Sequence, residues 1–529
     1  MEAAIGNGVD GGGRLRRVPQ IALVVLLLLE LGAALALTDG RLIYTLDDPY
    51  IHLAFAEGLS HGHFGLNPAE ASAPCSSILW PFLLAPFARL ELALWLPLAL
   101  NAACALLTLG IVQRSLEDAL DLEHEPGREG AACVLALLAI PALNLVGLAF
   151  TGMEHSLQVL VAALLTRGVI LASQSGRAPG WLLFVIVLGP LVRYENAALS
   201  AAALLWLWLA GERAKALGCA ALIAATLGAY SALLLSLGLE PLPTSVMAKS
   251  AAVAPESGLK SFLYALYHNA SSTSGVLMSV AVVAFGSACF APRREVGERR
   301  VALCFAAALI LHLVVGRFGW YGRYEVYAWT AGVLVVLHLW RRGLRRWVDA
   351  RSLLTVAVVG LAVTVVTCRE YVIILGNNAF ASRNTYQQQY QLHRFVVDRL
   401  DEPVAVNDLG WVAFRNEKYV LDLWGLASIE ALEARRSHDD SAWITPLAAE
   451  HGVRTALLYE DWFPGLPESW TRVGELRMAG PRVTPAVDRV AIYALDAGQV
   501  PVLVDLLRDF EESLPQGATL ELEPALQVP

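Results

Sequence analysis

Apolar residues in this chain gather in long runs between Gln20 and Leu375, and short polar segments separate them. A helix needs about 20 mostly apolar residues to cross the hydrocarbon of a membrane. Eleven runs approach that length, so we expect about 11 transmembrane helices. The runs are 20–37, 94–112, 131–150, 157–171, 181–192, 197–210, 216–239, 275–290, 301–315, 326–340 and 353–375.

Two segments near the N-terminus need separate interpretation. Arg14, Arg16 and Arg17 precede the first run as in a signal peptide, but the run holds Glu30 and lacks a clear cleavage site. We therefore expect a retained first helix. The apolar segment 77–90 holds two prolines and is short for a span, so we interpret it as an interfacial or re-entrant piece on the outer face.

The pattern changes after Leu375. Strands are predicted at 404–406, 419–423, 455–459 and 490–494, alternating with helices at 388–400, 428–435 and 500–514. Residues 377–529 hold 13 Lys and Arg against 23 Asp and Glu, a net charge of −10 in a chain of net charge −9. The tail is thus predicted to be an acidic, soluble α/β domain that binds acceptor or acts as a lid. Its charge argues against nucleic acid as a partner.

The basic loops orient the predicted helices. Arg and Lys concentrate in short cytoplasmic loops, and the loops 14–17, 293–300 and 341–351 all fall on one side when the N-terminus is cytoplasmic. The predicted fold is an α-helical polytopic membrane protein with a C-terminal soluble α/β domain, in a cell inner or plasma membrane. Its parts are a cytoplasmic N-terminus (1–19), a multi-pass domain (20–376) with outer loops 38–93 and 240–274, and an extracytoplasmic, periplasmic α/β domain (377–529).

Five polar segments interrupt the apolar runs, and this orientation places all of them on the outer face. Ionisable residues at membrane depth are costly and usually mark a functional site. The segments are 45–58, 151–156, 193–196, 240–250 and 317–325.

The first segment holds an adjacent acidic pair, Asp47 and Asp48. Desolvation and like-charge repulsion raise the pKa of one member of such a pair. A carboxylate so placed can accept the proton of an acceptor hydroxyl as a general base. The structural alternative is that Asp48 caps a helix beginning near Pro49. The two roles are compatible.

Positive charges in the other segments suit a phosphate at headgroup level. Arg193, Lys249 and Arg323 are the predicted phosphate ligands, because Arg binds phosphate through two hydrogen bonds and Lys as a point charge. The alternative is that they reach toward lipid headgroups or pair with neighbours, as Arg193 could with Glu195. The predicted substrate contacts are Tyr50, His52, Glu154, Glu195 and Tyr321.

Metal and cofactor chemistry is not predicted. His52, His61 and His63 are closely spaced, but no Cys or Glu partners complete a zinc site. The seven cysteines lie outside the tail, and the chain has no CxxC, HExxH or cofactor motif.

Six motifs follow one another along the chain: LDDPYIHLAFAEGLSHGHFGLNP, APCSSILW, TGMEHSLQVL, LVRYENAAL, LPTSVMAKS and VAVNDLGWVAFRNEKYVLDLWGL. In this order the chain resembles membrane glycosyltransferases of the GT-C superfamily, which include protein O-mannosyltransferases and lipid A aminoarabinose transferases. It resembles most the polyprenyl-phosphate-dependent arabinofuranosyltransferase-like branch. Tyr194 and Asn196 stand where that branch has Pro and Gly, Thr244 where it has Asn, and Cys75 and Ser76 disrupt its Thr-Ser-Pro element. These departures concern the donor more than the reaction.

The resemblance implies inverting transfer of a sugar, such as the pentose arabinofuranose, from a polyprenyl-phosphate donor. The acceptor hydroxyl would belong to a glycan, lipid or protein, and membrane lipids would surround the enzyme. Asp47 matches the catalytic base of the family and Asp48 supports it, with Arg193 and Lys249 near the carrier phosphate. The alternatives are a lipid-linked sugar flippase or transporter and an oligosaccharide polymerase or ligase. The sequence shows no internal repeat of the kind that transport favours.

Overall fold

The computed structural model describes residues 9–249, 259–438 and 440–526. The chain divides into two compact units, each assembled from three segments. The first contains Met1–Leu31, Pro97–Gly228 and Ala251–Gly376, and the second contains Gly32–Leu96, Ala229–Ser250 and Asn377–Pro529. The tail therefore forms one unit with segments 32–96 and 229–250. The sides of the membrane predicted for the three domains stay a prediction.

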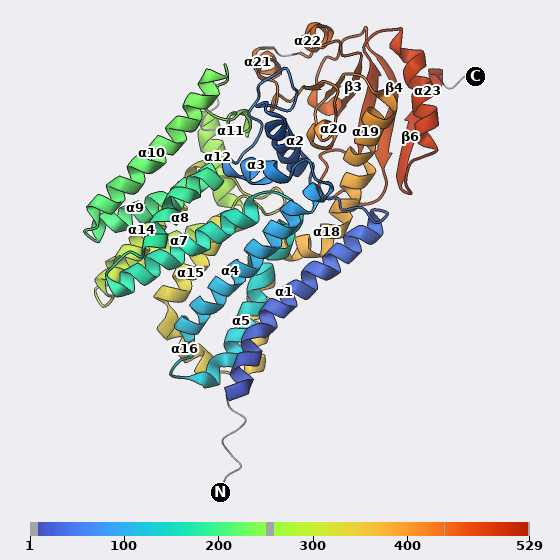
Figure 1. Ribbon diagram of the computed structural model, residues 1–529. Coiled ribbons are helices and arrows are strands. Elements are labelled where there is room, and N and C mark those ends of the chain that lie inside the picture. The colour runs from blue at the N-terminus through green and yellow to red at the C-terminus, as the bar shows by residue number, and fades with distance from the viewer. Residues whose placement is uncertain (1–8, 250–258, 439, 527–529) are drawn as a thin grey trace. The chain divides into compact units, whose positions relative to one another are not determined.

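The first unit is helical throughout its described part (Figure 1). Three of its helices, α1, α10 and α18, continue into the second unit. The helices are α1 (Val9–Leu37), α4 (Leu96–Leu120), α5 (Glu129–Ala142), α6 (Leu145–Phe150), α7 (His155–Ser175), α8 (Gly180–Val192), α9 (Ala197–Leu209), α10 (Arg213–Ser236), α12 (Leu259–Ser271), α13 (Thr273–Phe290), α14 (Val296–Val315), α15 (Val326–Leu339), α16 (Arg341–Asp349), α17 (Leu353–Thr367) and α18 (Arg369–Gln387).

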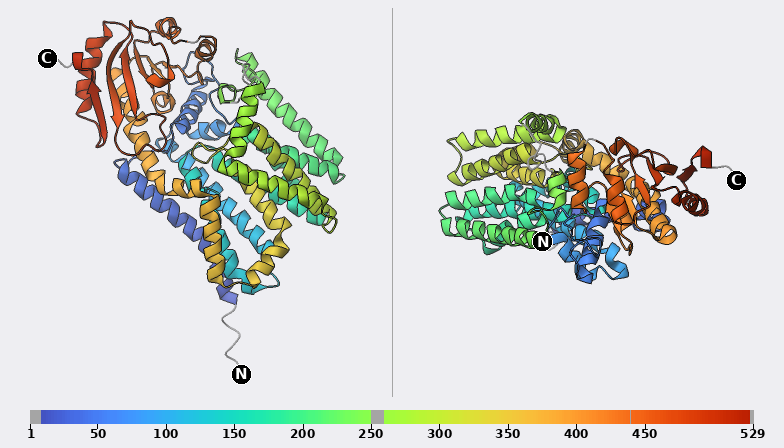
Figure 2. Two further views of the ribbon diagram at one scale, coloured as in Figure 1. Left: turned by 180° about the vertical axis from the view of Figure 1, so that it is seen from behind. Right: turned by 90° about the horizontal axis from the view of Figure 1, so that it is seen from above.

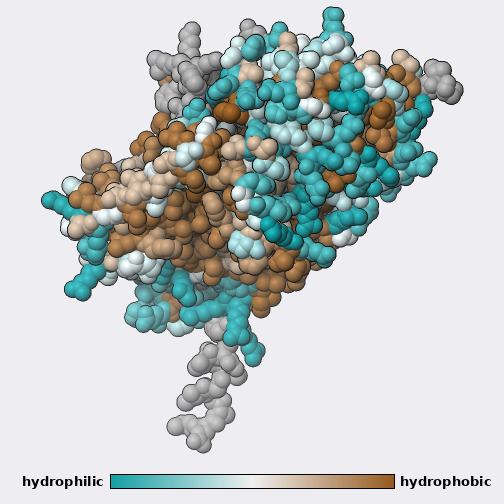
Figure 3. Space-filling model, turned by 45° about the horizontal axis from the view of Figure 1, so that its top comes forward, coloured by the Kyte–Doolittle hydropathy of each residue, from teal (hydrophilic) through white to brown (hydrophobic). Residues whose placement is uncertain are grey.

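Among the described residues, five helices are long and apolar enough to cross a membrane, or six if one bent pair counts as a span. The five are α1 from Arg14, α4, α7, α10 and α13, and the pair, bent by 81°, is Leu353–Thr367 with Arg369–Leu400. Apolar side chains cover the outside of these helices (Figure 3), and Val283 and Leu354 are each 73% exposed. Such an apolar surface suits lipid better than water. The total of about eleven spans stays a prediction.

The predicted run 131–150 is not one helix but two. Pro141 lies in the last turn of α5, and Asn144 has the left-handed φ of 48° before α6 begins. Proline lacks the N–H that the helix needs, and asparagine tolerates this conformation. The Asn144 side chain donates to the carbonyl of Gly322 at 3.2 Å, which holds the break against the loop before α15.

A six-stranded sheet forms the centre of the second unit, seen from behind in Figure 2. Its strands are β1 (Val404–Val406), β2 (Val420–Asp422), β3 (Thr455–Leu458), β4 (Thr471–Met478), β5 (Arg489–Ala494) and β6 (Ala518–Leu522). The order is β2-β1-β3-β5-β4-β6, with β1 parallel to β2 and β3 and the other pairs antiparallel. The four predicted strands are confirmed. Strands β4 and β6 were missed because β4 carries charges at Arg472, Glu475 and Arg477.

Helices pack on this sheet. They are α19 (Gln389–Phe395), continued by a wider turn at Val396–Leu400, α20 (Gly410–Ala413), α21 (Ile429–Ser437), α22 (Ile444–Glu450) and α23 (Gln499–Glu511). Ala405, Leu421 and Ala456 of the sheet form one fully buried core cluster with Ala431 of α21 and Ile444 of α22. The three predicted tail helices are confirmed near their expected bounds.

Segment 32–96 also belongs to the second unit. It contains α2 (Asp48–His61), α3 (Leu79–Leu84) and short 3₁₀ turns at Ala85–Phe87 and Glu91–Leu94, and α11 (Thr244–Lys249) lies in segment 229–250. The pieces between 79 and 87 are too short to span a membrane, as expected for the apolar segment 77–90. The Thr244 side chain donates to the carbonyl of Ala73 at 3.0 Å, joining the two segments.

Asn67 attaches this segment to the edge of the sheet. Its Nδ2 donates to the carbonyl of Val420 at 3.0 Å, and its Oδ1 accepts the N–H of Val420 at 2.9 Å. The amide side chain thus pairs with edge strand β2 as a neighbouring strand would.

Replacing Asn67 with Ala should lower the stability of the protein. Both backbone groups of Val420 would lose their partners in a buried place, and each such loss costs about 1–3 kcal/mol. Thermal unfolding of the purified protein in detergent measures the effect. Asn416→Ala is the matched control, because that amide also makes two backbone hydrogen bonds, to the carbonyl of Val412 and from the N–H of Lys418, but both lie within its own loop. Equal melting temperatures for both variants would contradict a clamp at Asn67.

Candidate active site

The Asp47 carboxylate is bound by the backbone of the tail. Its Oδ2 accepts the N–H of Gly410 at 2.7 Å, and its Oδ1 accepts the N–H of Trp411 at 2.9 Å. These residues open α20, where N–H groups have no partner within the helix. A Cβ at position 410 would lie 2.1 Å from the Asp47 carbonyl oxygen, so only glycine fits. Helices α2 and α20 therefore meet at this carboxylate (Figure 1).

The start of α2 differs from the prediction. The helix begins at Asp48, with Asp47 at the preceding cap position, and the Asp47 side chain makes no capping bond to α2. The expectation that Asp48 caps this helix is therefore wrong. Asp48 lies in the first turn instead, where the helix dipole favours a carboxylate.

A third carboxylate interacts with the pair. Asp408 follows strand β1, and its Oδ2 accepts hydrogen bonds from the Tyr459 hydroxyl at 2.7 Å and from Gln389 Nε2 at 3.1 Å. Burial raises the pKa of Asp47 well above its ordinary value, and the charges of Asp408 and Asp48 raise it further against the two backbone hydrogen bonds. Burial likewise raises the pKa of Asp408, with Asp48 adding to the effect. The three acids thus favour retention of a proton.

Aromatic side chains pack at the contact between α2 and α20. The rings of Tyr50 and Trp411 stack with centroids 3.9 Å apart, and the Tyr50 hydroxyl accepts the N–H of Tyr44 at 2.8 Å. Tyr50 is fully buried. In this structure its ring therefore stabilises the contact between α2 and α20, and the predicted contact with a sugar stays a prediction.

A buried ion-pair cluster lies in the first unit. Arg193 Nη1 donates to Glu154 at 2.5 Å, while its Nε and Nη2 donate to both oxygens of Glu195 at 3.1 and 2.7 Å. Burial lowers the pKa of Arg193, but the two carboxylates outweigh it and raise that pKa above its ordinary value. The predicted pairing of Arg193 with Glu195 is confirmed. A carrier phosphate could reach these donors only in exchange for a carboxylate, and Glu195, with a side chain 32% exposed, is the more accessible one.

The turn before α15 completes this cluster. Gly319, Trp320, Tyr321 and Gly322 have φ values of 78°, 46°, 64° and 57°, a run of left-handed residues that is strained at the two aromatics. Arg323 is 2% exposed, and its Nη2 donates to the Tyr324 hydroxyl at 3.2 Å. The Arg193 guanidinium lies 5.9 Å from the centroid of the same Tyr324 ring. The strain thus accompanies the placement of two arginines beside one aromatic ring.

The structure distributes the predicted residues between the two units. The first unit brings together Glu154, Arg193, Glu195 and Arg323, with Tyr321 in the adjoining turn. The second unit holds Asp47, Asp48, Tyr50 and buried His52 on or beside α2. Helix α11 ends at Lys249, whose side chain lies outside the described residues. The predicted roles of these residues stay predictions.

Asp408, Gln389 and Tyr459 were not predicted as site residues. A signal was present, because Asp408 lies directly beyond a predicted strand, and polar residues at the carboxyl ends of parallel strands often bind ligands. The sequence could not relate it to Asp47, which precedes it by 361 positions.

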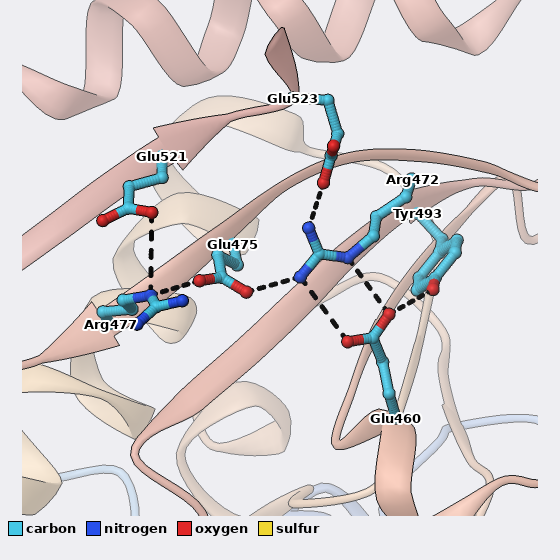
Figure 4. A network of polar contacts seen from close by, with 7 residues as sticks. All are labelled: Glu460, Arg472, Glu475, Arg477, Tyr493, Glu521 and Glu523. Carbon is cyan, nitrogen blue, oxygen red and sulfur yellow. Dashed lines mark hydrogen bonds and ion pairs between the residues drawn. The ribbon is translucent and has the colours of Figure 1, made fainter.

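A different charged cluster lies on β4 and β6 (Figure 4). Arg472 pairs with Glu460 at 3.0 Å and also with Glu475 and Glu523, and Arg477 pairs with Glu475. These residues line a hollow of about 790 Å³. The arginines lower the pKa of Glu475 despite its burial, so this carboxylate is a poor candidate for proton transfer.

Comparisons with known proteins found one family model and several solved structures. Residues 379–493 match a family described as a domain of unknown function (DUF8728), and no curated protein matches the sequence. The oligosaccharyltransferase of Archaeoglobus fulgidus, in complex with Zn and sulfate, is 12% identical at a TM-score of 0.44, over 94% of this chain and 74% of that one. ArnT from Cupriavidus metallidurans is 14% identical at 0.45, over 91% and 98%. The arabinofuranosyltransferase AftD from Mycobacteria is 15% identical at 0.40, over 90% and 42%.

Replacing Arg193 with Ala should destabilise the protein by about 3–5 kcal/mol, because it leaves buried carboxylates without their cation. Adding Glu154→Gln to that variant should restore part of the loss, since Glu154 is fully buried and its charge is the more costly one. A double-mutant cycle on thermal unfolding checks the coupling. Additive effects of the two changes would argue against a buried ion pair.

Proposed function

We propose that this protein is a membrane glycosyltransferase that transfers a sugar from a polyprenyl-phosphate donor to an acceptor hydroxyl on the extracytoplasmic face. The observation that carries the proposal is the part-buried acidic pair Asp47 and Asp48, in which the surroundings of Asp47 raise its pKa. A carboxylate of raised pKa is a stronger base than an exposed one, which suits proton abstraction from an alcohol. The ordered motifs in the sequence support the same reaction, with arabinofuranose as the sugar that they favour.

The reaction is a single displacement. A carboxylate of the pair takes the acceptor hydroxyl proton while the acceptor oxygen attacks the anomeric carbon of the donor. The bond from that carbon to the phosphate oxygen breaks on the opposite face, so the configuration inverts and polyprenyl phosphate leaves. Arg193, Lys249 and Arg323 are the proposed groups that stabilise the phosphate charge.

The alternatives receive less support. A flippase or transporter would need charges that bind its cargo without chemistry, and it would not need a carboxylate of raised basicity. A polymerase or ligase of lipid-linked oligosaccharides would use the same base and differ only in what the carrier holds. Its substrate, not its mechanism, separates it from the proposed function.

Neutralising the general base should reduce turnover by roughly 100-fold or more. Asp47→Asn and Asp48→Asn are compared in purified protein, with decaprenyl-phosphate arabinofuranose as donor and a synthetic arabinan acceptor. The donor is also supplied with other sugars, because the sugar is the least constrained part of the proposal. The inactive variant identifies the base.

Each variant needs a control for folding, because Asn at position 47 would direct an NH₂ group toward one of two backbone N–H donors. Glu57→Gln, which alters another contact between α2 and the tail, at the N–H of Arg415, serves as the control. Full activity of both Asn variants on a donor that the parent protein uses would refute the assignment.

The phosphate role of Arg193 predicts a gain on removal of its competitor. Glu195→Gln weakens the carboxylate hold on the guanidinium, so donor affinity should rise by about tenfold, equivalent to about 1.4 kcal/mol. Equilibrium binding of the donor lipid measures this. The control is Glu212→Gln, which removes the carboxylate of the Lys215 ion pair on a helix end. Unchanged affinity in Glu195→Gln would leave Arg193 as a structural cation.

A further inference from the structure

Asp408, a residue of the tail, lies in the region around Asp47, and a purely structural role does not explain why it is an acid. Asp408 is a part-buried carboxylate whose charge, together with that of Asp48, acts on Asp47, which the backbone two and three residues after Asp408 binds. Burying like charges together is unfavourable, and an amide could accept the same hydrogen bonds without that cost. A residue kept only for packing would therefore serve better as Asn.

The orientation of Asp408 is determined by two donors. The Tyr459 hydroxyl donates to Asp408 Oδ2, and Gln389 Nε2 donates to the same oxygen. The neighbouring Asn407 accepts the N–H of Tyr459 at 2.7 Å through its Oδ1, which holds the turn after β1 against β3. Both oxygens of Asp47 are bound to the backbone two and three residues further along, at Gly410 and Trp411. One short turn therefore holds both Asp408 and Asp47.

We propose that Asp408 is a positioning residue of the reaction centre, held by Tyr459 and Gln389 in the turn after β1 whose backbone N–H groups bind Asp47. The proposal rests on the proposed function and extends it by assigning part of the base to the tail domain. In the resting protein one proton would be retained among Asp47, Asp48 and Asp408. Loss of Asp408 would leave Asp47 ionised more easily and less basic.

The other titratable groups near the acids are Tyr50 on α2, Tyr459 after β3 and His393 on α19, which packs on Trp411. Their environments disfavour the charged form, because burial raises the pKa of Tyr50 and of Tyr459. The acids of this unit are therefore expected to account for pH dependence near neutrality.

The test is Asp408→Asn in the full chain, which keeps an oxygen for Tyr459 and removes the charge. The acid limb of the pH–rate profile, measured with the same arabinofuranose donor, should move toward lower pH by roughly one unit, because the like charge that raises the pKa of Asp47 is gone. Turnover at neutral pH should fall while donor affinity stays unchanged. An unaltered profile would overturn the proposal.

Stability against pH provides a second readout that needs no substrate. Because the folded pKa of Asp47 is raised, its contribution to stability is present at low pH and is lost as pH rises through that pKa. Asp408→Asn reduces the shift, so its melting temperature should exceed that of the parent at pH 8, and the difference should narrow at pH 5. A lower melting temperature at both values would show a purely structural role and overturn the proposal.

Asp422→Asn is the matched control. Asp422 is also buried, and its pKa is raised to about 6, but its oxygens accept the backbone N–H groups of Trp424, Leu426 and Ala427. Asn there should lower the melting temperature at both pH values and leave the acid limb in place. If Asp47→Asn and Asp48→Asn stay active, the proposed base fails. If either is inactive while Asp408→Asn has the parent profile, only this inference fails.

Discussion

The two hydrogen bonds from the backbone of α20 to Asp47 are the constraint on which the second unit depends. They join a residue that follows the first apolar helix to a residue of the tail more than 360 positions later. Two further contacts join segment 32–96 to the tail: Tyr50 stacks on Trp411, and Asn67 pairs with strand β2. The tail is thus part of the structure that holds the acidic pair. A carboxylate bound by two N–H groups has lost most of its rotational freedom, which is the entropic requirement of a preorganised base.

Those bonds stabilise an arrangement that is otherwise unfavourable. Backbone donors lower the pKa of Asp47, whereas burial and the nearby acids raise it, and the latter effects are larger. Opposing effects of this kind on one carboxyl group are typical of functional sites, because a carboxylate needs a raised pKa to act as an effective base near neutral pH. The Arg193 cluster of the first unit has the opposite character. There two carboxylates surround one cation, and despite burial the Arg193 charge lowers the pKa of Glu195 while both carboxylates raise that of Arg193.

Local patterns in the sequence were sufficient for much of the fold. Apolar run length indicated the membrane-crossing helices, and alternation indicated β1, β2, β3 and β5 of the sheet. The prediction failed where a tertiary contact or a charge altered the local pattern. Run 131–150 breaks at Pro141 and Asn144, and the break is held by a bond to Gly322, which lies far along the chain. The charged positions of β4 satisfy one another across the sheet, so a strand formed where the sequence resembles a solvated loop.

The sequence by itself determined which residue types could do acid–base and phosphate chemistry, and it placed Asp47, Asp48, Glu154, Arg193 and Glu195 in the polar segments that matter. It also offered the pairing of Arg193 with Glu195 as the alternative to a phosphate role, and the structure shows that pairing. Only the tertiary structure decided that Asp408, Gln389 and Tyr459 lie around the acidic pair, and that Gly410 must be glycine. The physical reason is that a pKa shift depends on burial and on charges within a few ångströms. Neither is encoded in sequence separation, and both arise only when the turn after β1 packs against the start of α2.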